Sequence, residues 1–149
     1  MPQTTDAIVA TNTVVKLDNA AGVLTDISGD SNKVELGPKN GVAETRVFGN
    51  QWMLRGVVGK DVDISLDCIY TTNAAEGAQL LDGWFYGGTD TARTIQIDIP
   101  DGDPGSFRYT GEVILSDYTE TLDATADEWV MVSAKLLPSG AFTKATIGT

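Results

Sequence analysis

The chain has 149 residues, of which 42% are hydrophobic and 21% charged, with a net charge of −11, one cysteine and no histidine. This length suits a single domain with one core. The acidic balance argues against an outer surface that grips nucleic acid, because phosphate binding needs clustered Lys and Arg. The absence of histidine excludes Ser-His-Asp triads and His-ligated metals, and a lone Cys68 cannot form an internal disulfide.

The start of the sequence, MPQTTDAIVATNTVV, does not have the pattern of a secretory signal. It lacks the basic start and the apolar run of a secretory signal, and no segment of the chain has the length and hydrophobicity of a membrane span. We therefore expect a protein that is made in the cytoplasm, does not contact a membrane and stays soluble at first.

Apolar residues recur over much of the chain with the period of two that is typical of β-strands. The expected strands are 8–17, 23–27, 42–48, 52–58, 61–70, 94–99, 107–118 and 128–137. Gly49-Asn50, between the third and fourth of these, is a turn signal. About eight strands are typical of sandwiches and barrels, so the sequence predicts a mainly β, antiparallel domain.

Residues 28–42, SGDSNKVELGPKNGV, depart from this pattern. Four Gly or Pro residues punctuate the segment, and Val34 and Leu36 are its two good apolar anchors. Such a segment cannot bury enough surface to fold alone, and a long loop in a compact domain is usually functional or mobile. Two interpretations follow: a flexible surface loop, or an arm that becomes ordered against a neighbouring subunit.

The expected strand 61–70 has two unlike faces. Its even-numbered residues are apolar, whereas the odd-numbered ones include Asp61, Asp63 and Asp67. Aspartate is a poor strand former, so three of them on one face require a reason. Cys68 lies on the apolar face, and without a histidine to activate it we expect a small buried hydrophobe and not a nucleophile.

One helix is expected near the middle of the chain, over residues 74–86. Asn73 and Glu76 have the spacing of a capping box, and Gly87-Gly88 follows as a C-terminal stop. The residues expected on its buried face are Ala74, Ala78, Leu81 and Phe85. The sequence thus predicts an antiparallel β-domain with one flanking helix.

Asp98, Asp101 and Asp103 in DIPDGDPGS raise the possibility of a Ca²⁺ site, since hard cations bind clustered carboxylates. Their spacing lacks the twelve-residue loop with its distal glutamate, and DGDPG is also good turn chemistry. We favour the turn. No glycine-rich phosphate loop opens a helix, and no carboxylate pair is singled out for glycoside hydrolysis. We therefore expect no enzymatic activity, no cofactor and no metal.

Trp52, Trp84 and Trp129 would suit a carbohydrate platform if they were exposed together. Trp84 lies near the end of the expected helix and Trp129 at the start of a strand, so packing in the core or at an interface is favoured for both. A carbohydrate-binding or adhesin-type β-sandwich nevertheless stays open as an alternative function, as does an enzyme with an unrecognised carboxylate pair.

The run GVLTDISGDSNKVELGPKNGVAETRVFGN resembles the corresponding region of tail tube proteins of long-tailed bacteriophages. The matching elements are Leu24, Asp26-Ile27-Ser28, Val34-Glu35-Leu36, Glu44-Thr45 and Phe48-Gly49. The likeness continues through Trp52, the strand 61–70 and the helix ending in Trp84-Phe85, and it covers residues 14–137. In many relatives a proline directly follows the Val-Glu-Leu motif, whereas this chain has Gly37 between Leu36 and Pro38.

The resemblance implies a β-sandwich or half-barrel with one flanking helix, in a structural subunit of the virion tail. Such subunits form six-membered rings that stack into a hollow tube, which carries the genome from capsid to host cell. Contractile tails and type VI secretion tubes use a similar subunit. The implied partners are further copies of the chain, a tape measure protein, a tail terminator, and tail-tip or baseplate proteins.

Within such a tube, Asp61, Asp63 and Asp67 are expected to line the lumen. At physiological salt, screening acts over about 8 Å, so an acidic wall repels DNA only at close range and lets it pass. The alternative is that these aspartates solubilise an outward face. The residues expected at subunit contacts are Val34, Leu36, Pro38, Val47 and Phe48.

Three segments are expected to order only on assembly, namely the N-terminal arm 1–6, the inter-ring loop 28–42 and the C-terminal arm 138–149.

Overall fold

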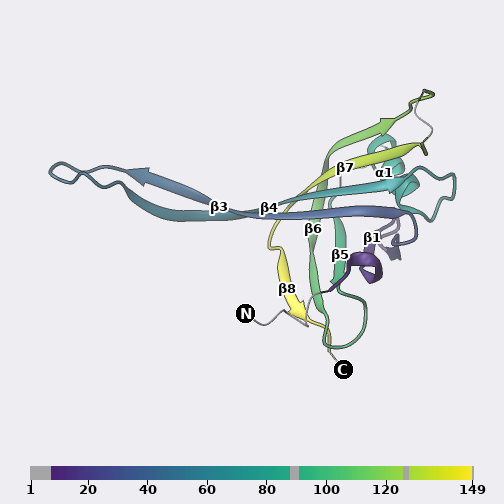
Figure 1. The fold of residues 1–149 in the computed structure, drawn as a ribbon, viewed down its shortest axis with the longest axis horizontal. Helices are drawn as coiled ribbons and strands as arrows, with labels where there is room; N and C mark the ends of the chain where they lie inside the picture. Colours follow the sequence, from purple (N-terminus) through teal and green to yellow (C-terminus); the bar gives the residue numbers. More distant parts are fainter. Residues whose placement is uncertain (1–7, 88–90, 126–127, 149) are drawn as a thin grey trace, which may run out of the picture.

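The computed structural model describes residues 8–87, 91–125 and 128–148. In this part of the chain, one antiparallel sheet forms most of the structure and one α-helix, α1 (Gly77–Tyr86), packs against it (Figure 1). A 3-10 helix, η1 (Ala10–Asn12), precedes the first strand. The strands are β1 (Val14–Asp18), β2 (Leu24–Asp26), β3 (Ser31–Thr45), β4 (Leu54–Ile69), β5 (Arg93–Ile99), β6 (Phe107–Thr121), β7 (Met131–Pro138) and β8 (Thr143–Thr146).

The strands lie in the order β2-β1-β5-β6-β7-β4-β3, and β8 pairs with β6 beyond the end of β7. Strand β6 changes neighbours near Val113, since it pairs with β5 up to this residue and with β7 from it onward. A register shift between Leu115 and Asp117 follows, and such a bulge bends and twists the strand. The described strands therefore form one curved sheet, the half-barrel form of the predicted mainly β fold.

One face of the sheet carries the core. The largest fully buried side chains include Leu17, Ile27, Ile64, Leu66, Leu81, Ile95, Ile97, Val113, Val132 and Leu136. On the expected strand 61–70, the residues Ile64, Leu66 and Cys68 are buried and alternate with half-buried polar ones, which confirms the predicted alternation. Helix α1 covers part of this face, and its Trp84 indole N–H donates to the Thr91 carbonyl at 3.0 Å.

Strands β3 and β4 form a hairpin much longer than the sheet that carries it. β4 pairs with β7 only from Ile64 to Ile69, whereas its pairing with β3 continues outward to Thr45 and Leu54. Residues 37–63 project from the sheet, and we call this segment the arm (Figure 1). Gly49 has a φ of 79° in the turn at its tip, a conformation that favours glycine, so the predicted turn is confirmed.

Residues 28–42 are not the loop that the composition predicted, because from Ser31 onward they belong to β3. Strand β3 is an edge strand of the sheet. An edge strand tolerates Pro38, because a proline on the unpaired side removes no hydrogen bond from the ladder. The prediction failed because it weighed only the apolar anchors within the segment. Its backbone is paired instead by β4, which is itself anchored in the core. That this segment contacts an adjacent ring stays a prediction.

Helix α1 begins at Gly77 and not at Ala74. The Asn73 side-chain Oδ1 accepts the N–H of Ala75 at 3.1 Å, so it closes a turn that precedes the helix. Glu76 is the N-cap residue and makes no side-chain capping bond. The capping-box spacing thus marks the turn before the helix.

The buried face of α1 is also rotated from the predicted one. Ala78 and Leu81 are fully buried as expected, whereas Ala74 is exposed and Phe85 is 54% exposed. Trp84 takes the core position that was assigned to Phe85, with 3% exposure. The later start of the helix explains why Ala74 lies outside this face.

The C-terminal segment is ordered within the single chain, contrary to the prediction for residues 138–149. Strand β8 pairs with the first residues of β6. Ile147, directly after β8, makes two backbone hydrogen bonds with Gly105 and Ser106 in the loop before β6. Gly111 makes this possible, because Phe142 packs where a side chain would otherwise lie. The predicted N-terminal arm, residues 1–6, lies outside the described residues.

A buried carboxylate joins the start of β3 to α1. Asp30 is 5% exposed, and its Oδ2 accepts the Ala78 N–H at 3.2 Å, while its Oδ1 has no hydrogen-bond partner among the described residues. The positive end of the helix dipole favours a negative charge there. Burial outweighs this effect and raises the pKa of Asp30.

We predict that Asp30→Asn changes how stability depends on pH. The pKa of Asp30 is higher in the folded chain than in the unfolded chain. The contribution of Asp30 to stability therefore falls as the pH rises from its unfolded-state pKa through its folded-state pKa. Asparagine cannot ionise but can still accept the Ala78 N–H. The melting temperature of the variant minus that of the wild type should therefore increase as the pH rises above about 4, the ordinary pKa of an unfolded aspartate. Melting followed by circular dichroism measures this difference.

A difference that does not change with pH would contradict this account of Asp30. Asp30→Ala is the control, because it leaves the Ala78 N–H without its acceptor. It should cost about 1–3 kcal/mol of folding free energy across the pH range.

We also predict that Gly111→Ala loosens β8 from β6. A Cβ at Gly111 would lie 2.8 Å from Phe142 Cδ2 and 3.0 Å from the Ala141 carbonyl oxygen. Overpacking of this kind costs about 1–3 kcal/mol. Hydrogen exchange in β8 should accelerate more than in α1. Gly56→Ala is the matched control, since nothing lies within 4 Å of a Cβ there. Equal protection of β8 in both variants would reject the prediction.

Candidate assembly surfaces

The three aspartates of the strand 61–70 lie on the face of β4 opposite the core. Asp63 and Asp67 are half-buried and alternate with fully buried residues, and Asp61 is exposed where the arm leaves the sheet. The side chains of Asp61 and Asp63 are 48% and 38% exposed. The structure thus brings the three together on one polar face, as their spacing predicted. Their place in a lumen stays a prediction.

Lysines from the neighbouring strand share this polar face. Lys39 Nζ lies 3.0 Å from Asp63 Oδ2 and 3.8 Å from Asp61 Oδ2, and the hydrogen bond to Asp63 raises the pKa of Lys39. Lys33 pairs with Glu35 at 2.9 Å. Ion pairs this exposed add little stability, but they reduce the local charge. The face is therefore an interleaved pattern of acids and lysines and not a bare row of carboxylates.

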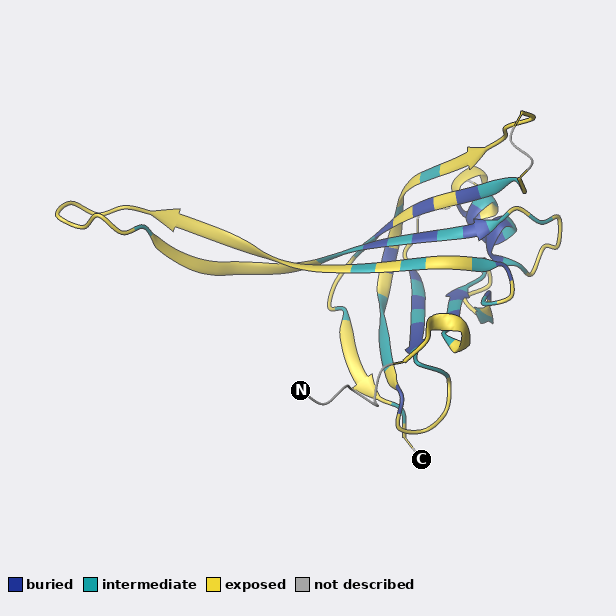
Figure 2. Ribbon diagram, viewed as in Figure 1, coloured by how far each residue is buried: buried dark blue, intermediate teal, exposed yellow. Residues whose placement is uncertain are grey.

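The arm exposes most of its large apolar side chains (Figure 2). At its tip, Phe48 is 109% exposed and Trp52 is 81% exposed. The other exposed large apolar residues of the arm are Val42, Val47, Leu54, Val57 and Val58. A concentration of apolar side chains on one projection marks a binding surface. Val47 and Phe48, predicted to make subunit contacts, thus lie at the arm tip, 47% and 109% exposed.

The other predicted contact residues lie at the root of the arm. Val34 and Leu36 are partly buried against the chain's own core, and Pro38 is exposed in β3. Val34 and Leu36 also line a groove of about 670 Å³ that the segment before β1 closes on one side. The apolar residues lining the groove include Ile8, Val9, Val34, Leu36, Ile97 and Ile99. The assignment of Val34, Leu36 and Pro38 to subunit contacts stays a prediction.

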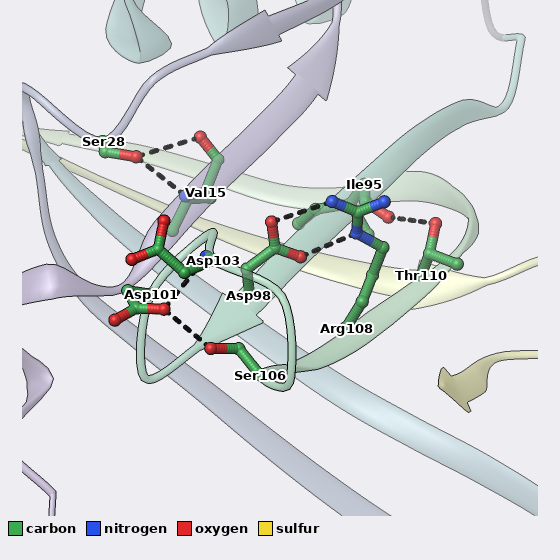
Figure 3. Close-up of polar contacts among 9 residues, drawn as sticks. All are labelled: Val15, Ser28, Ile95, Asp98, Asp101, Asp103, Ser106, Arg108 and Thr110. Carbon is green, nitrogen blue, oxygen red and sulfur yellow. Dashed lines mark hydrogen bonds and ion pairs between the residues drawn. The ribbon is translucent and has the colours of Figure 1, made fainter. Parts of the chain in front are cut away.

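The acidic residues around position 100 form an ion pair and a turn (Figure 3). Asp98 is 1% exposed and accepts hydrogen bonds from Arg108 Nε at 2.9 Å and Nη2 at 3.2 Å. Asp101 Oδ1 accepts the Asp103 N–H at 3.0 Å and the Ser106 hydroxyl at 2.7 Å, and the bond from Ser106 lowers the pKa of Asp101. The predicted turn is confirmed. Within the described ranges, no group of three or more His, Cys, Asp or Glu side chains could hold a metal ion.

Cys68 and the three tryptophans do not form a chemical site together. Cys68 is fully buried, and burial raises the pKa of its thiol to about 12, so it is the small core hydrophobe that was predicted. Trp84 is buried as expected, whereas Trp129, for which packing was favoured, is 79% exposed. With Trp84 inside the core and Trp52 on the arm, the three cannot share one carbohydrate platform.

The structure adds an aromatic cluster that the sequence analysis missed. The ring centroid of Phe85 lies 5.0 Å from that of Tyr86, edge to face, and 6.4 Å from that of Tyr118 in a stacked arrangement. The Tyr118 hydroxyl donates to Glu120 at 2.8 Å. Tyr86 is 71% exposed, so this cluster is a second candidate contact surface. Three aromatic residues in succession, Trp84 to Tyr86, are the available sequence signal, because a helix cannot bury all three on one face.

Comparisons with known proteins show a likeness in structure and none in sequence. No family model and no curated protein matches the chain. A chain in the tail of an empty gene transfer agent particle, refined with C6 symmetry, is 13% identical with a TM-score of 0.71, and the match covers 93% of this chain and 99% of that one. A chain in the six-fold symmetrised baseplate of the anti-feeding prophage is 14% identical with a TM-score of 0.76, covering 99% and 100%. A chain of the SPP1 tail tube is 10% identical with a TM-score of 0.68, covering 96% and 81%.

These matches extend over nearly the whole of this chain, so the likeness concerns the complete fold and not one shared motif. The part of the chain that the structure describes contains no helix long and apolar enough to cross a membrane. The residues from Leu24 to Gly49 that resemble tail tube proteins belong to β2, β3 and the arm tip, which are parts of this fold. The chain therefore has the fold of tail tube proteins of bacteriophages and phage-like particles.

Proposed function

We propose that the chain is a structural, non-enzymatic subunit of a tail tube made of stacked six-membered rings. The observation that carries the proposal is a tail-type fold over nearly the whole chain, joined to an arm whose apolar side chains are exposed in the single chain. Rings of six are supported by the C6 and six-fold symmetry of two assemblies with similar chains.

The edges of the sheet also support ring formation. Strands β2 and β3 end the strand order, so each has one neighbour, and β3 is fifteen residues long. A long unpaired edge invites uncontrolled strand pairing. In a ring, the edges of neighbouring subunits meet and their backbone groups are satisfied. Lateral contacts that close, combined with axial contacts that repeat without closing, produce a stack of rings.

The polar face of β4 is suited to line the lumen of this tube. The opposite face is occupied by the core and by α1, so the face with Asp61, Asp63 and Asp67 is the one that can meet water. Its acids repel DNA within about 8 Å at physiological salt, which lets the genome pass without binding. The pairs made by Lys39 weaken this repulsion without reversing it.

On this proposal the subunit is made in the host cytoplasm and functions in the virion tail. Its partners are further copies of itself, a tape measure protein inside the tube, a tail terminator, and tail-tip or baseplate proteins. The proposed contact with baseplate proteins is supported by the similar fold of a chain in the anti-feeding prophage baseplate. The carbohydrate-binding alternative has less support, because the buried Trp84 breaks up its aromatic platform.

We predict that the purified chain forms six-fold rings or hollow filaments as its concentration is raised, since the exposed arm and sheet edges are covered only by assembly. Electron microscopy of negatively stained protein measures this. A protein that stays monomeric at every concentration and binds glycans would contradict the proposal and favour the adhesin alternative.

We predict that changing Asp61, Asp63 and Asp67 together to lysine makes assembled tubes retain DNA. A basic lumen would bind the phosphate backbone at low salt and release it as the salt concentration rises. Co-sedimentation of a short DNA duplex with the tubes measures retention, after electron microscopy has shown that the variant assembles.

The matched control places the same change of charge elsewhere, with Asp103, Asp123 and Glu128 changed to lysine. These residues lie outside β4, in the segments that follow β5 and β6. Tubes of the lumen variant that retain no more DNA than tubes of the control would reject the electrostatic role of the polar face and leave the tube itself in place.

A further inference from the structure

The groove beside β3 has the size of a site for aromatic side chains, and part of its lining is apolar. Its volume of about 670 Å³ falls within the ~300–1,000 Å³ that is typical of pockets for drug-sized groups. Val34 and Leu36 form partly buried apolar walls, and Ile8 and Val9 stand at its rim, 59% and 69% exposed. Among the described residues, these four belong to the apolar part of the groove, whose lining also contains polar side chains such as Thr11, Ser31 and Lys33.

The tip of the arm carries side chains that fit such a groove. Phe48 and Trp52 are its two largest exposed residues. Their turn is internally bonded, since the Asn50 N–H donates to the Val47 carbonyl at 3.3 Å and Asn50 Oδ1 accepts the Trp52 N–H at 2.9 Å. A turn ordered before binding loses less conformational entropy when it docks. The tip therefore presents two rings in a defined arrangement.

The arm cannot fill the groove of its own chain. Strand β3 is extended from the groove residue Val34 outward, and at about 3.3 Å per residue it places Phe48 roughly 45 Å away. Figure 1 shows the arm leading straight away from the body of the molecule. An arm tip in this groove must come from another copy.

Charge favours contact between an arm and the body of another copy. Residues 37–63 contain four basic and three acidic side chains, a net charge of +1. The whole chain carries −11, so the remainder carries −12. Two such bodies repel each other at close range, while an arm can approach either body without this cost. The arm is thus the part of each copy best suited to meet the acidic body of the next.

We propose that Phe48 and Trp52 at the arm tip of one copy occupy the groove of a copy in the adjacent ring. The inference rests on the proposed function, because it supplies the axial contact between stacked rings. It joins three of the predicted contact residues into one interface, with Val34 and Leu36 as walls of the groove and Phe48 in the inserted tip. The docked tip lies on the core side of the sheet, so the polar face stays free.

This docking limits the spacing of the rings. If the tip of one copy lies in the groove of the next, the two grooves are separated by the reach of the arm, whatever the rotation between the copies. The axial repeat can then not exceed roughly 45 Å. Electron microscopy of the assembled protein measures this repeat, and a spacing clearly above that limit would overturn the proposal.

Crosslinking in the assembled protein tests the contact without removing either aromatic side chain. Gln51→Cys places a thiol at the tip and Thr11→Cys places one at the groove, both at exposed positions. A short bismaleimide should join this double variant into a covalent ladder, because each copy is linked to one copy on either side. The native Cys68 does not compete, since it is buried and its thiol pKa is raised to about 12.

The matched control combines Gln51→Cys with Thr119→Cys, which is exposed on the polar face of β6, opposite the groove side of the sheet. This pair should give no ladder. Rings or filaments that give a ladder with neither pair, or with the control pair, would overturn the assignment of the groove and leave the tail tube standing. Failure of the wild type to form any ring or filament would overturn the proposed function and this inference with it.

Discussion

Strand β4 has two partners over very different lengths, and this inequality shapes the molecule. Its final residues, from Ile64 to Ile69, lie between β3 and β7 and bury their apolar side chains in the core. Before Ile64, β4 has β3 as its partner and no described layer covers either face, so the consecutive residues Val57 and Val58 are both exposed. Backbone pairing maintains the arm, and the anchored end of β4 holds it in place. Exposed apolar surface on such an arm is unfavourable in water, which makes association its natural outcome.

The two faces of the sheet separate two requirements that would otherwise conflict. In the proposed tube, a wall that DNA passes needs hydrated charge and no apolar surface to which DNA would adhere, whereas contacts between copies need apolar surface that can be covered. Alternation along β3 places Val34 and Leu36 on the core side and Lys33 and Glu35 on the polar side. Because successive side chains of a strand point to opposite faces, one strand serves both requirements without compromise.

The sequence predicted those parts of the fold in which a residue's environment follows from its own neighbours. The alternation from Val62 to Cys68 is of this kind, and so is the turn at Gly49. It failed where a distant partner decides the structure. Residues 31–41 look like a loop by composition, yet β4 pairs with them along their length. Strand β8 is weakly apolar, but it docks because Gly111, far away in the sequence, leaves space for Phe142. The pairing of Lys39 with Asp61 and Asp63 was missed for the same reason, since cross-strand register cannot be read from one strand.

If copies of the chain assemble as we propose, the charge distribution favours one order of events. Bodies of net charge −12 repel one another at short range, so two copies gain nothing from approaching face to face. The arm extends roughly 45 Å from the groove at its root, several times the screening length of about 8 Å at physiological salt. Its tip can therefore reach another copy while most of the two acidic bodies stay beyond the range of strong repulsion. Once the tip is docked, a neighbouring copy is held nearby, and its sheet edges meet at a high effective concentration. On this reasoning the axial contact through the arm comes first, and closure of the sheet edges follows from it.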